Sequence, residues 1–151
     1  MLQKKICMFG SPLGTRLIRE CFYSIFSEKY RSTIGVAIHR KQVQVGKVDL
    51  NLLVWDLAFN DDCWRTLPSY LRGMSGYVVV EDPADEASQR LTQEFHQVVR
   101  NAVGQLPSLT FTLGSEQQTK SEKVSIGQLF EASFQDFARR VLQYDEPQLV
   151  F

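Results

Sequence analysis

The sequence lacks an excess of either charge, because seventeen Lys and Arg residues balance seventeen Asp and Glu residues among its 151 residues. This balance gives no indication of nucleic-acid binding or of attraction to an anionic membrane. Cysteine is scarce, and Cys7, Cys21 and Cys63 lack metal-site spacing, which favours buried thiols in a reducing compartment. No apolar run reaches membrane-spanning length, and the last residues hold no cysteine to lipidate. We therefore expect a cytoplasmic protein that binds no nucleic acid and has no membrane anchor.

What the sequence does contain is a regular alternation of strand-like and helix-like patterns. We predict one domain over residues 1–144 and a short C-terminal tail over residues 145–151. The last helix is predicted from a capping box, in which Ser125 is followed by Gln128, and from an apolar stripe behind it. The periodicity predicts strands over 3–10, 34–45, 48–56, 76–82 and 108–113 and helices over 15–26, 85–104 and from 125 onward, the last with a stripe of Phe130, Phe134, Phe137 and Val141.

This order of elements predicts an α/β fold. Strands that alternate with helices form a largely parallel sheet that is covered on both faces. The runs 34–45 and 48–56 meet at Gly46, so we expect them to form an antiparallel hairpin. We predict a mostly parallel five-stranded sheet, with the 34–45 strand antiparallel at one edge and the 108–113 strand at the other. An open edge strand is prone to aggregation, so a partner, a loop or the terminal tail is expected to cover the second edge.

The segment after the first strand is similar to a phosphate-binding loop. Ligands of parallel sheets bind at the carboxyl ends of the strands, and the loop pattern there is G-x-x-x-x-G-K-[ST]. Here three residues separate Gly10 from Gly14, and Thr15 and Arg16 follow without a lysine. Pro12 has no N–H to donate to a phosphate. Two alternatives stay open for Arg16, which is either a substitute charge or a solvated residue on the first helical turn.

Three further segments complete a resemblance to a known family. "FSEKYRSTIGV", residues 26–36, resembles the first switch of a Rab protein. "LLVWDLAFNDD", residues 52–62, resembles the W-D-T-A-G-Q-E segment at the second switch. "YLRGMSGYVVVEDPAD", residues 70–85, is similar to the Y-Y-R-G-A stretch and the strand after it. In this order, residues 4–113 resemble the Ras-like small GTPases, closest to the Rab branch and its bacterial relatives. The resemblance implies the three-layer small G-domain, a P-loop NTPase fold.

The resemblance also implies a site for GTP or GDP with magnesium. Thr33 matches the threonine that contacts magnesium and the terminal phosphate, and Asp56 matches the aspartate that holds a magnesium-bound water. The alternative for these two residues is structural: Asp56 braces a turn, and Thr33 is an ordinary residue at the entry of a strand. If a nucleotide binds, the resemblance assigns it to Gly10, Gly14, Thr15, Arg16, Thr33 and Asp56, with Thr33 and Asp56 as the metal contacts.

The departures from the family pattern fall on the chemistry. Phe59 replaces the glycine whose backbone contacts the γ-phosphate, and Asn60 stands at the water-positioning glutamine. The N-K-x-D motif that reads guanine is missing after the 108–113 strand, where Ser-Glu-Gln-Gln stands instead. About eleven residues separate Leu113 from Ser125, which is too few for the fourth helix and sixth strand of the family.

These departures predict a pseudo-GTPase, a Ras-like fold that serves as a protein–protein interaction or scaffold module without GTP hydrolysis. We expect no catalytic residue and no cofactor; the alternative is a small GTPase-like protein that retains weak or unusual binding or hydrolysis of GTP with magnesium. Phe59 is expected either to fill the γ-phosphate and magnesium region or to pack under the second switch, and in both cases to hold that switch in one state. The resemblance places a protein partner on the switch and inter-switch surface, which comprises Ile34, Val36, Trp55, Phe59, Trp64 and Tyr70.

Overall fold

The computed structural model describes residues 2–11, 18, 28–31, 37–57, 63–113 and 120–148, with the backbone alone for 28–31, 63–66 and 120–126. Of the helix predicted over residues 15–26, the described part is Ile18, which is helical and fully buried. The elements are β1 (Leu2–Gly10), β2 (Glu28–Arg31), β3 (Ala37–Val45), β4 (Val48–Asp56), α2 (Cys63–Leu71), β5 (Met74–Glu81), α3 (Glu86–Val103), β6 (Ser108–Thr112) and α4 (Lys120–Asp145).

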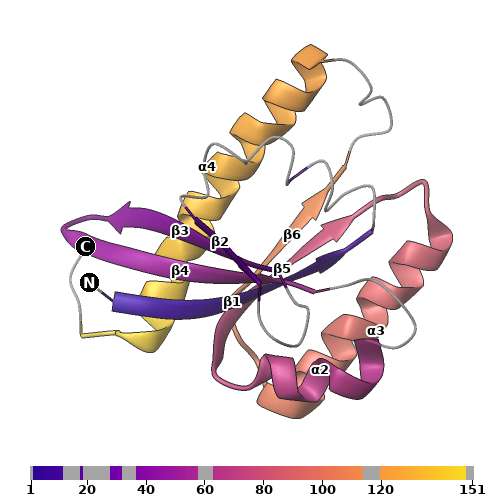
Figure 1. Ribbon diagram of the computed structural model, residues 1–151, viewed down its shortest axis with the longest axis horizontal. Coiled ribbons are helices and arrows are strands. Elements are labelled where there is room, and N and C mark those ends of the chain that lie inside the picture. The colour runs from indigo at the N-terminus through magenta and orange to yellow at the C-terminus, as the bar shows by residue number, and fades with distance from the viewer. Residues whose placement is uncertain are drawn as a thin grey trace.

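The strands form one mixed sheet in the order β2-β3-β4-β1-β5-β6 (Figure 1). β1 runs parallel to β4 and β5, and β6 runs parallel to β5, whereas β3 is antiparallel to both β2 and β4. This is the mostly parallel α/β sheet of a small G-domain, which confirms the predicted fold class. The predicted hairpin is also present, with Gly46 in its turn at a φ of 59°.

The predicted count of five strands is corrected to six. β2 pairs outside β3, with Tyr30 opposite Ile38, so β2 rather than the run 34–45 occupies that edge. The segment E-K-Y-R has one apolar residue among three charged ones, so its sequence shows no alternating pattern, and backbone pairing with β3 makes it a strand. The strand predicted over 108–113 is β6, and no described strand pairs outside it.

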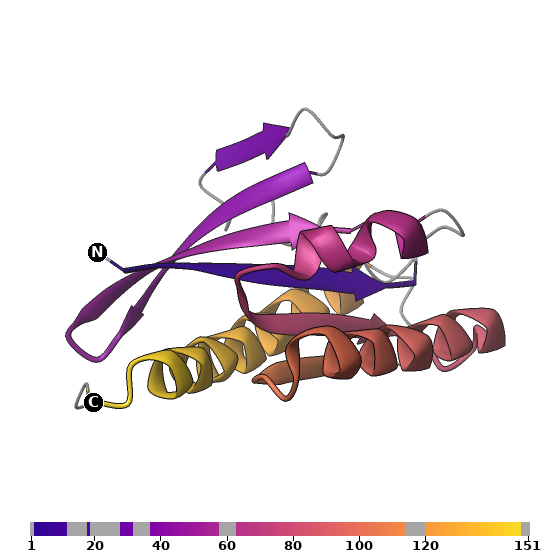
Figure 2. The same cartoon turned by 90° about the horizontal axis from the view of Figure 1, so that it is seen from below.

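Each face of the sheet has its own hydrophobic core. Ile6 and Met8 of β1 pack with the phenylalanines of α4, whereas Cys7 and Phe9 pack with α2 and α3. Phe9 stacks on Phe95 of α3, with ring centroids 4.4 Å apart. α4 lies along one side of the sheet and α2 and α3 along the other (Figures 1 and 2). The helices therefore cover both faces, as a parallel sheet requires.

α4 has the predicted apolar stripe but a different start. The helix begins at Lys120, so the predicted cap at Ser125 is wrong, and Ser125 lies inside the helix. Residues 120–124 contain neither glycine nor proline, so nothing in them stops the helix from extending beyond the capping box. The stripe is buried against the sheet as predicted, and its members are Phe130, Phe134, Phe137 and Val141.

α3 begins and ends where the sequence predicts. The Asp85 carboxylate accepts a hydrogen bond from the backbone N–H of Ser88 at 3.1 Å, which satisfies one of the free donors of the first turn. Gly104 follows the last residue of the helix with a φ of 81°, a conformation that glycine adopts without steric cost.

The end of α4 is fixed to the start of β1. Lys4 Nζ lies 3.4 Å from Asp145 Oδ2 and 3.1 Å from Glu146 Oε1. α4 ends at Asp145, which is the first residue of the predicted tail. The start of β1 and the end of α4 lie at the same end of the molecule in both views (Figures 1 and 2). Within the described residues, no helix is both long enough and apolar enough to span a bilayer.

Candidate ligand edge and partner surface

The two described residues of the predicted nucleotide site, Gly10 and Asp56, lie at the carboxyl ends of the neighbouring parallel strands β1 and β4. Met8 pairs with Asp56 in parallel register, and its carbonyl accepts a hydrogen bond from the Leu57 N–H at 3.0 Å. The remaining predicted residues of this site and of the switches lie outside the described residues, and predictions for them stay predictions. They are Gly14, Thr15, Arg16, Thr33, Ile34, Val36, Phe59 and the side chain of Trp64.

Gly10 lies against the backbone of β5. A Cβ atom at this position would come 2.4 Å from the carbonyl oxygen of Val80, a distance that real structures do not show. The next residue continues this attachment, because the Ser11 N–H donates a hydrogen bond to the Val80 carbonyl at 3.2 Å. Packing against β5 therefore accounts for the first glycine of the loop without any phosphate.

Trp55 and Tyr70, two residues of the predicted partner surface, form a half-buried aromatic pair with ring centroids 6.3 Å apart. Lys5 Nζ lies 4.0 Å from the centroid of the Trp55 ring and donates a hydrogen bond to the Arg72 carbonyl at 2.9 Å. This is a cation–π contact, which adds a positive charge to the aromatic pair. The buried Trp55 Nε1 meets no hydrogen-bond acceptor in the described structure.

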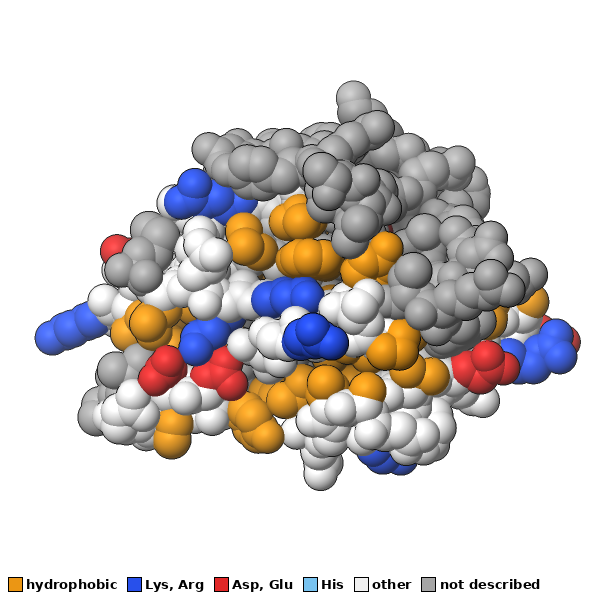
Figure 3. Space-filling model, turned by 60° about the horizontal axis from the view of Figure 1, so that its bottom comes forward, with side chains coloured by type: hydrophobic (Ala, Val, Ile, Leu, Met, Phe, Trp, Pro, Cys, Tyr) orange, Lys and Arg blue, Asp and Glu red, His pale blue; other side chains and the backbone are white. Residues whose placement is uncertain are grey.

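Lys5 was absent from the residues that the sequence singled out. It lies on β1, one strand away from Trp55 and more than sixty residues away from Arg72 in the chain, so only the parallel register of β1 and β4 reveals the contact. Partial burial lowers the pKa of Lys5, and the neighbouring Cys7 opposes that shift. Figure 3 shows a face on which Lys and Arg side chains lie among hydrophobic ones, with acidic side chains toward its ends.

Cys7 lies directly beneath this aromatic pair and is fully buried, as expected for it. Its Sγ is 3.6 Å from the Tyr70 carbonyl oxygen, to which it donates a hydrogen bond. Burial raises the pKa of the Cys7 thiol to about 12, and the positive charge of Lys5 only partly opposes this. Because thiolates rather than thiols are nucleophilic, Cys7 is a packing residue.

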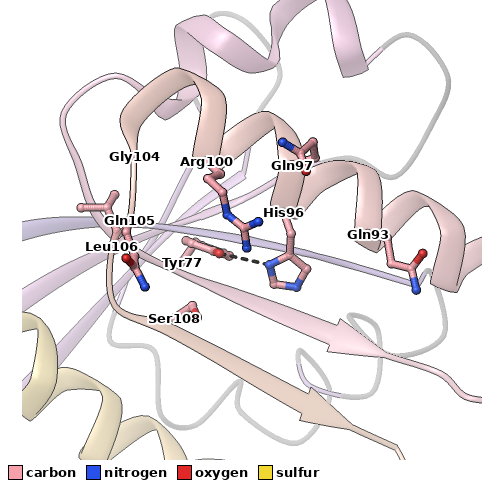
Figure 4. A pocket seen from close by; sticks show the side chains of 9 residues that line it. All are labelled: Tyr77, Gln93, His96, Gln97, Arg100, Gly104, Gln105, Leu106 and Ser108. Atoms are coloured by element: carbon pink, nitrogen blue, oxygen red, sulfur yellow. Dashed lines mark hydrogen bonds between the residues drawn. The ribbon is translucent and has the colours of Figure 1, made fainter.

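A hollow lies between α3 and the start of β6. It is a cavity of about 480 Å³. Tyr77 from β5 and His96 from α3 meet there, with Tyr77 Oη 3.0 Å from His96 Nδ1 (Figure 4). Burial lowers the pKa of His96, with Glu81 opposing and Arg100 reinforcing the shift. The imidazole is therefore neutral at pH 7 and can share a hydrogen bond with the phenol.

This cavity is polar, but the residues that line it form no metal-binding cluster. Figure 4 shows Arg100 and His96 of α3 pointing toward the strands, with His96 joined to Tyr77 of β5. No group of three or more His, Cys, Asp or Glu side chains that could hold a metal occurs among the described residues. Sequence reasoning missed the cavity because its residues come from β5, α3 and β6, and no local motif joins them.

The mixed sheet, its hairpin and its helices on both faces define the chain as a Ras-like small G-domain. Residues 5–118 match the family described as "Roc: Ras of Complex, Roc, domain of DAPkinase". The chain belongs to this Roc family of Ras-like domains.

A plant protein is also similar to this chain. The "Ras-related protein RABC2a" of Arabidopsis thaliana is 39% identical over 83 residues, which is 54% of this chain and 39% of that protein. The chain thus spans well under two thirds of the relative that it matches. The likeness supports the Ras-like and Rab-like assignment that the switch segments suggested.

Proposed function

We propose that this chain is a Ras-like interaction module that binds a protein partner through its switch and inter-switch surface and does not hydrolyse GTP. One observation carries the proposal. β6 ends at Thr112 and α4 begins at Lys120, so only the seven residues 113–119 connect them. A single helix with its two connections needs about 10–12 residues. This span has no room for the helix, strand and base-reading loop that Ras-like GTPases place there.

Because α4 begins at Lys120, the connection is shorter than the sequence predicts. With a helix start at Ser125, the connection had about eleven residues, whereas α4 takes up five of them. Residues 114–119 of this connection read Gly-Ser-Glu-Gln-Gln-Thr and do not contain the N-K-x-D motif, whose aspartate accepts hydrogen bonds from guanine in the family. Without that motif, the specific recognition of guanine is lost.

The phosphate side of the site supports the same proposal. Ras-like GTPases normally bind GTP or GDP with magnesium, using the loop lysine, a switch threonine and an aspartate. Asp56 lies at the carboxyl end of β4 and is the one described residue among the predicted magnesium contacts. Gly10 is explained by its contact with Val80, and the loop sequence has no lysine to neutralise phosphate charge. One carboxylate does not make up for the missing cation and base contacts.

The proposed partner surface combines aromatic area with a fixed positive charge. Trp55 and Tyr70 contact each other, and Lys5 is held over the indole by its bond to the Arg72 carbonyl. Aromatic residues beside a cation are typical of binding hot spots. None of these contacts depends on a γ-phosphate, so this surface persists without nucleotide.

Nucleotide content is the direct test. The purified protein would be heat-denatured, and released nucleotide would be measured by anion-exchange chromatography beside a Ras-like GTPase with intact motifs as a positive control. We expect no stoichiometric GTP or GDP. Titration with a fluorescent GTP analogue, with and without magnesium, should show no magnesium-dependent binding. Near one equivalent of bound guanine nucleotide, or tight magnesium-dependent binding, would favour the GTP-binding alternative and overturn the proposal.

A further inference from the structure

The outer edge of β6 offers backbone groups that no described strand pairs, although the Ser108 carbonyl accepts a hydrogen bond from Arg140 Nη2 at 3.0 Å. The Tyr77 N–H donates to the Pro107 carbonyl at 3.2 Å, and the Leu113 N–H donates to the Glu81 carbonyl at 2.9 Å. Odd-numbered residues of this segment therefore direct their backbone groups toward β5. Because strand residues alternate, Ser108, Thr110 and Thr112 direct theirs away from β5, where no described strand pairs with them.

The two edges of the sheet differ in how they are protected against pairing. β2 is four residues long, and three of its residues, Glu28, Lys29 and Arg31, are charged. Short, charged edge strands resist pairing with another chain. β6 reads Ser-Leu-Thr-Phe-Thr, with no charge, no proline and no glycine. The β6 edge thus lacks the features that prevent an edge strand from pairing with another chain.

The flank of α4 beside this edge is apolar at both ends. Tyr144 Oη donates a hydrogen bond to the Gln105 carbonyl, and Arg140 Nη2 donates to the Ser108 carbonyl, so these residues lie on the β6 side of α4. Helical spacing places Leu129 on the same flank. Leu129 is 63% exposed and Tyr144 is 56% exposed, and they are the exposed large hydrophobic side chains among the described residues.

The sequence of β6 is complementary to itself when it is reversed. An antiparallel pair centred on Thr110 sets Leu109 against Phe111 and Ser108 against Thr112, and Thr110 faces its own copy. Apolar pairs then lie on the α4 side, where Leu109 and Phe111 already pack, and hydroxyl pairs lie on the α3 side. Such cross-strand pairs stabilise antiparallel sheets.

We propose that the β6 edge is the interface of a homodimer, in which β6 pairs antiparallel with β6 of a second copy. The two sheets join into one continuous sheet, with a two-fold axis that passes through the Thr110 pair perpendicular to the sheet. Thr110 is then a hydrogen-bonded pair, exchanging its backbone N–H and C=O bonds with its copy across about 5.5 Å. Such an interface is self-complementary and closed, so it stops at two copies.

The same symmetry accounts for the exposed side chains on α4. A two-fold axis perpendicular to the sheet keeps both α4 helices on one face, side by side and antiparallel. Leu129 and Tyr144 of each copy then lie beside the dimer interface and are less exposed to solvent. The proposed dimer is independent of nucleotide and of the switch surface, which lies on other strands. An experiment that refutes the dimer therefore does not refute the proposed function, and the reverse also holds.

Charge substitutions at the two-fold axis test the dimer. Thr110 is exposed, so Thr110→Lys and Thr110→Glu should leave the fold intact, as circular dichroism can verify. Each variant sets a charge against the same charge, and we expect the dimer dissociation constant to rise about tenfold or more. Sedimentation velocity over a concentration series measures this. An equimolar mixture of the two variants should dimerise again, because Lys then faces Glu.

Gln42 supplies the matched control, since it is an exposed position on β3 of the same sheet. Gln42→Lys and Gln42→Glu should dimerise like the wild type. A wild-type chain that stays monomeric at every concentration, or Thr110 variants that dimerise as well as the wild type, would overturn the proposal. So would variants that become monomeric but do not recover on mixing, because self-pairing at Thr110 demands that recovery.

Discussion

At the scale of single residues, Gly10 shows how one position can suggest two different roles. In the sequence it is the first glycine of a loop that resembles a phosphate-binding loop. In the structure, its missing side chain lets β1 approach Val80 of β5 closely, and the following N–H is bonded to the same carbonyl. A close strand contact of this kind is invisible to sequence reasoning, because Val80 is seventy residues away.

Gly10→Ala should therefore destabilise the fold whether or not a nucleotide is present. The added Cβ would lie 2.4 Å from a backbone oxygen, and backbone atoms cannot move aside cheaply. We expect the free energy of unfolding to fall by about 1–3 kcal/mol, the usual cost of overpacking. Urea denaturation measures it, with the exposed Gln42→Ala as a control that changes little. An unchanged midpoint for Gly10→Ala would contradict the packing role.

Cys7 leads to a prediction about alkaline pH. Burial raises the pKa of its thiol from 9.0 to about 12, so the folded state keeps the neutral form. Above pH 9 the unfolded chain ionises at this cysteine and the folded chain does not, which favours unfolding. Between pH 9 and 12 the wild type should lose up to about 1.4 kcal/mol per pH unit relative to Cys7→Ala. Denaturation of the two proteins in parallel across this pH range measures the difference in their free energies of unfolding. A difference that stays constant with pH would contradict the prediction, because it would mean that the thiol ionises equally in the folded and unfolded states.

At the scale of elements, regular patterns were predictable and pairings were not. The caps of α3 and the phenylalanine stripe of α4 are local signals, and both are confirmed. β2 escaped because E-K-Y-R becomes a strand only through its bonds to β3. The start of α4 was misplaced because Ser125 and Gln128 also suit a helix interior. Local rules find periodic segments, whereas edges and boundaries depend on tertiary contacts.

The stripe of α4 should account for much of the stability of its face of the sheet. Phe137 is fully buried and lies against Gly76, where a Cβ would come within 2.9 Å of its ring. Phe137→Ala leaves a cavity that the surrounding strands cannot close, and we expect a loss of about 3–5 kcal/mol. Gln128→Ala on the exposed side of the same helix should change stability by less than ~0.5 kcal/mol. Thermal and urea unfolding of the two variants measure these losses of stability. Equally small losses for Phe137→Ala and Gln128→Ala would contradict a tightly packed α4.

At the scale of the whole molecule, the ordered segments predicted the family, and the structure adds what surrounds the site. The order of the switch-like segments was enough to indicate a Ras-like domain. Lys5, Tyr77, His96 and Arg100 were not predictable as neighbours, because strand register and helix docking bring them together. The partner residues on the switches remain predictions from resemblance.

Restoring the loop lysine alone should not restore nucleotide binding. Thr15→Lys would supply the missing cation, yet the connection between β6 and α4 would still lack the N-K-x-D motif that reads guanine in the family. We expect no magnesium-dependent binding of GTP by calorimetry in either wild type or variant. Tight binding gained by Thr15→Lys would mean that base contacts come from elsewhere in the chain, and that the short connection does not prevent GTP binding.

The ion pairs of Lys4 with Asp145 and Glu146 have a consequence for connectivity. They hold the start of β1 beside the end of α4, so these two segments from opposite ends of the sequence are neighbours in space. A circular permutant that joins residues 151 and 1 through a short flexible linker and opens at Gly46–Lys47 should keep every strand pairing. In this permutant β3 and β4 would lie at opposite ends of the chain and would pair through tertiary folding rather than through a covalent turn. The order of the elements along the chain would change, whereas the fold would not.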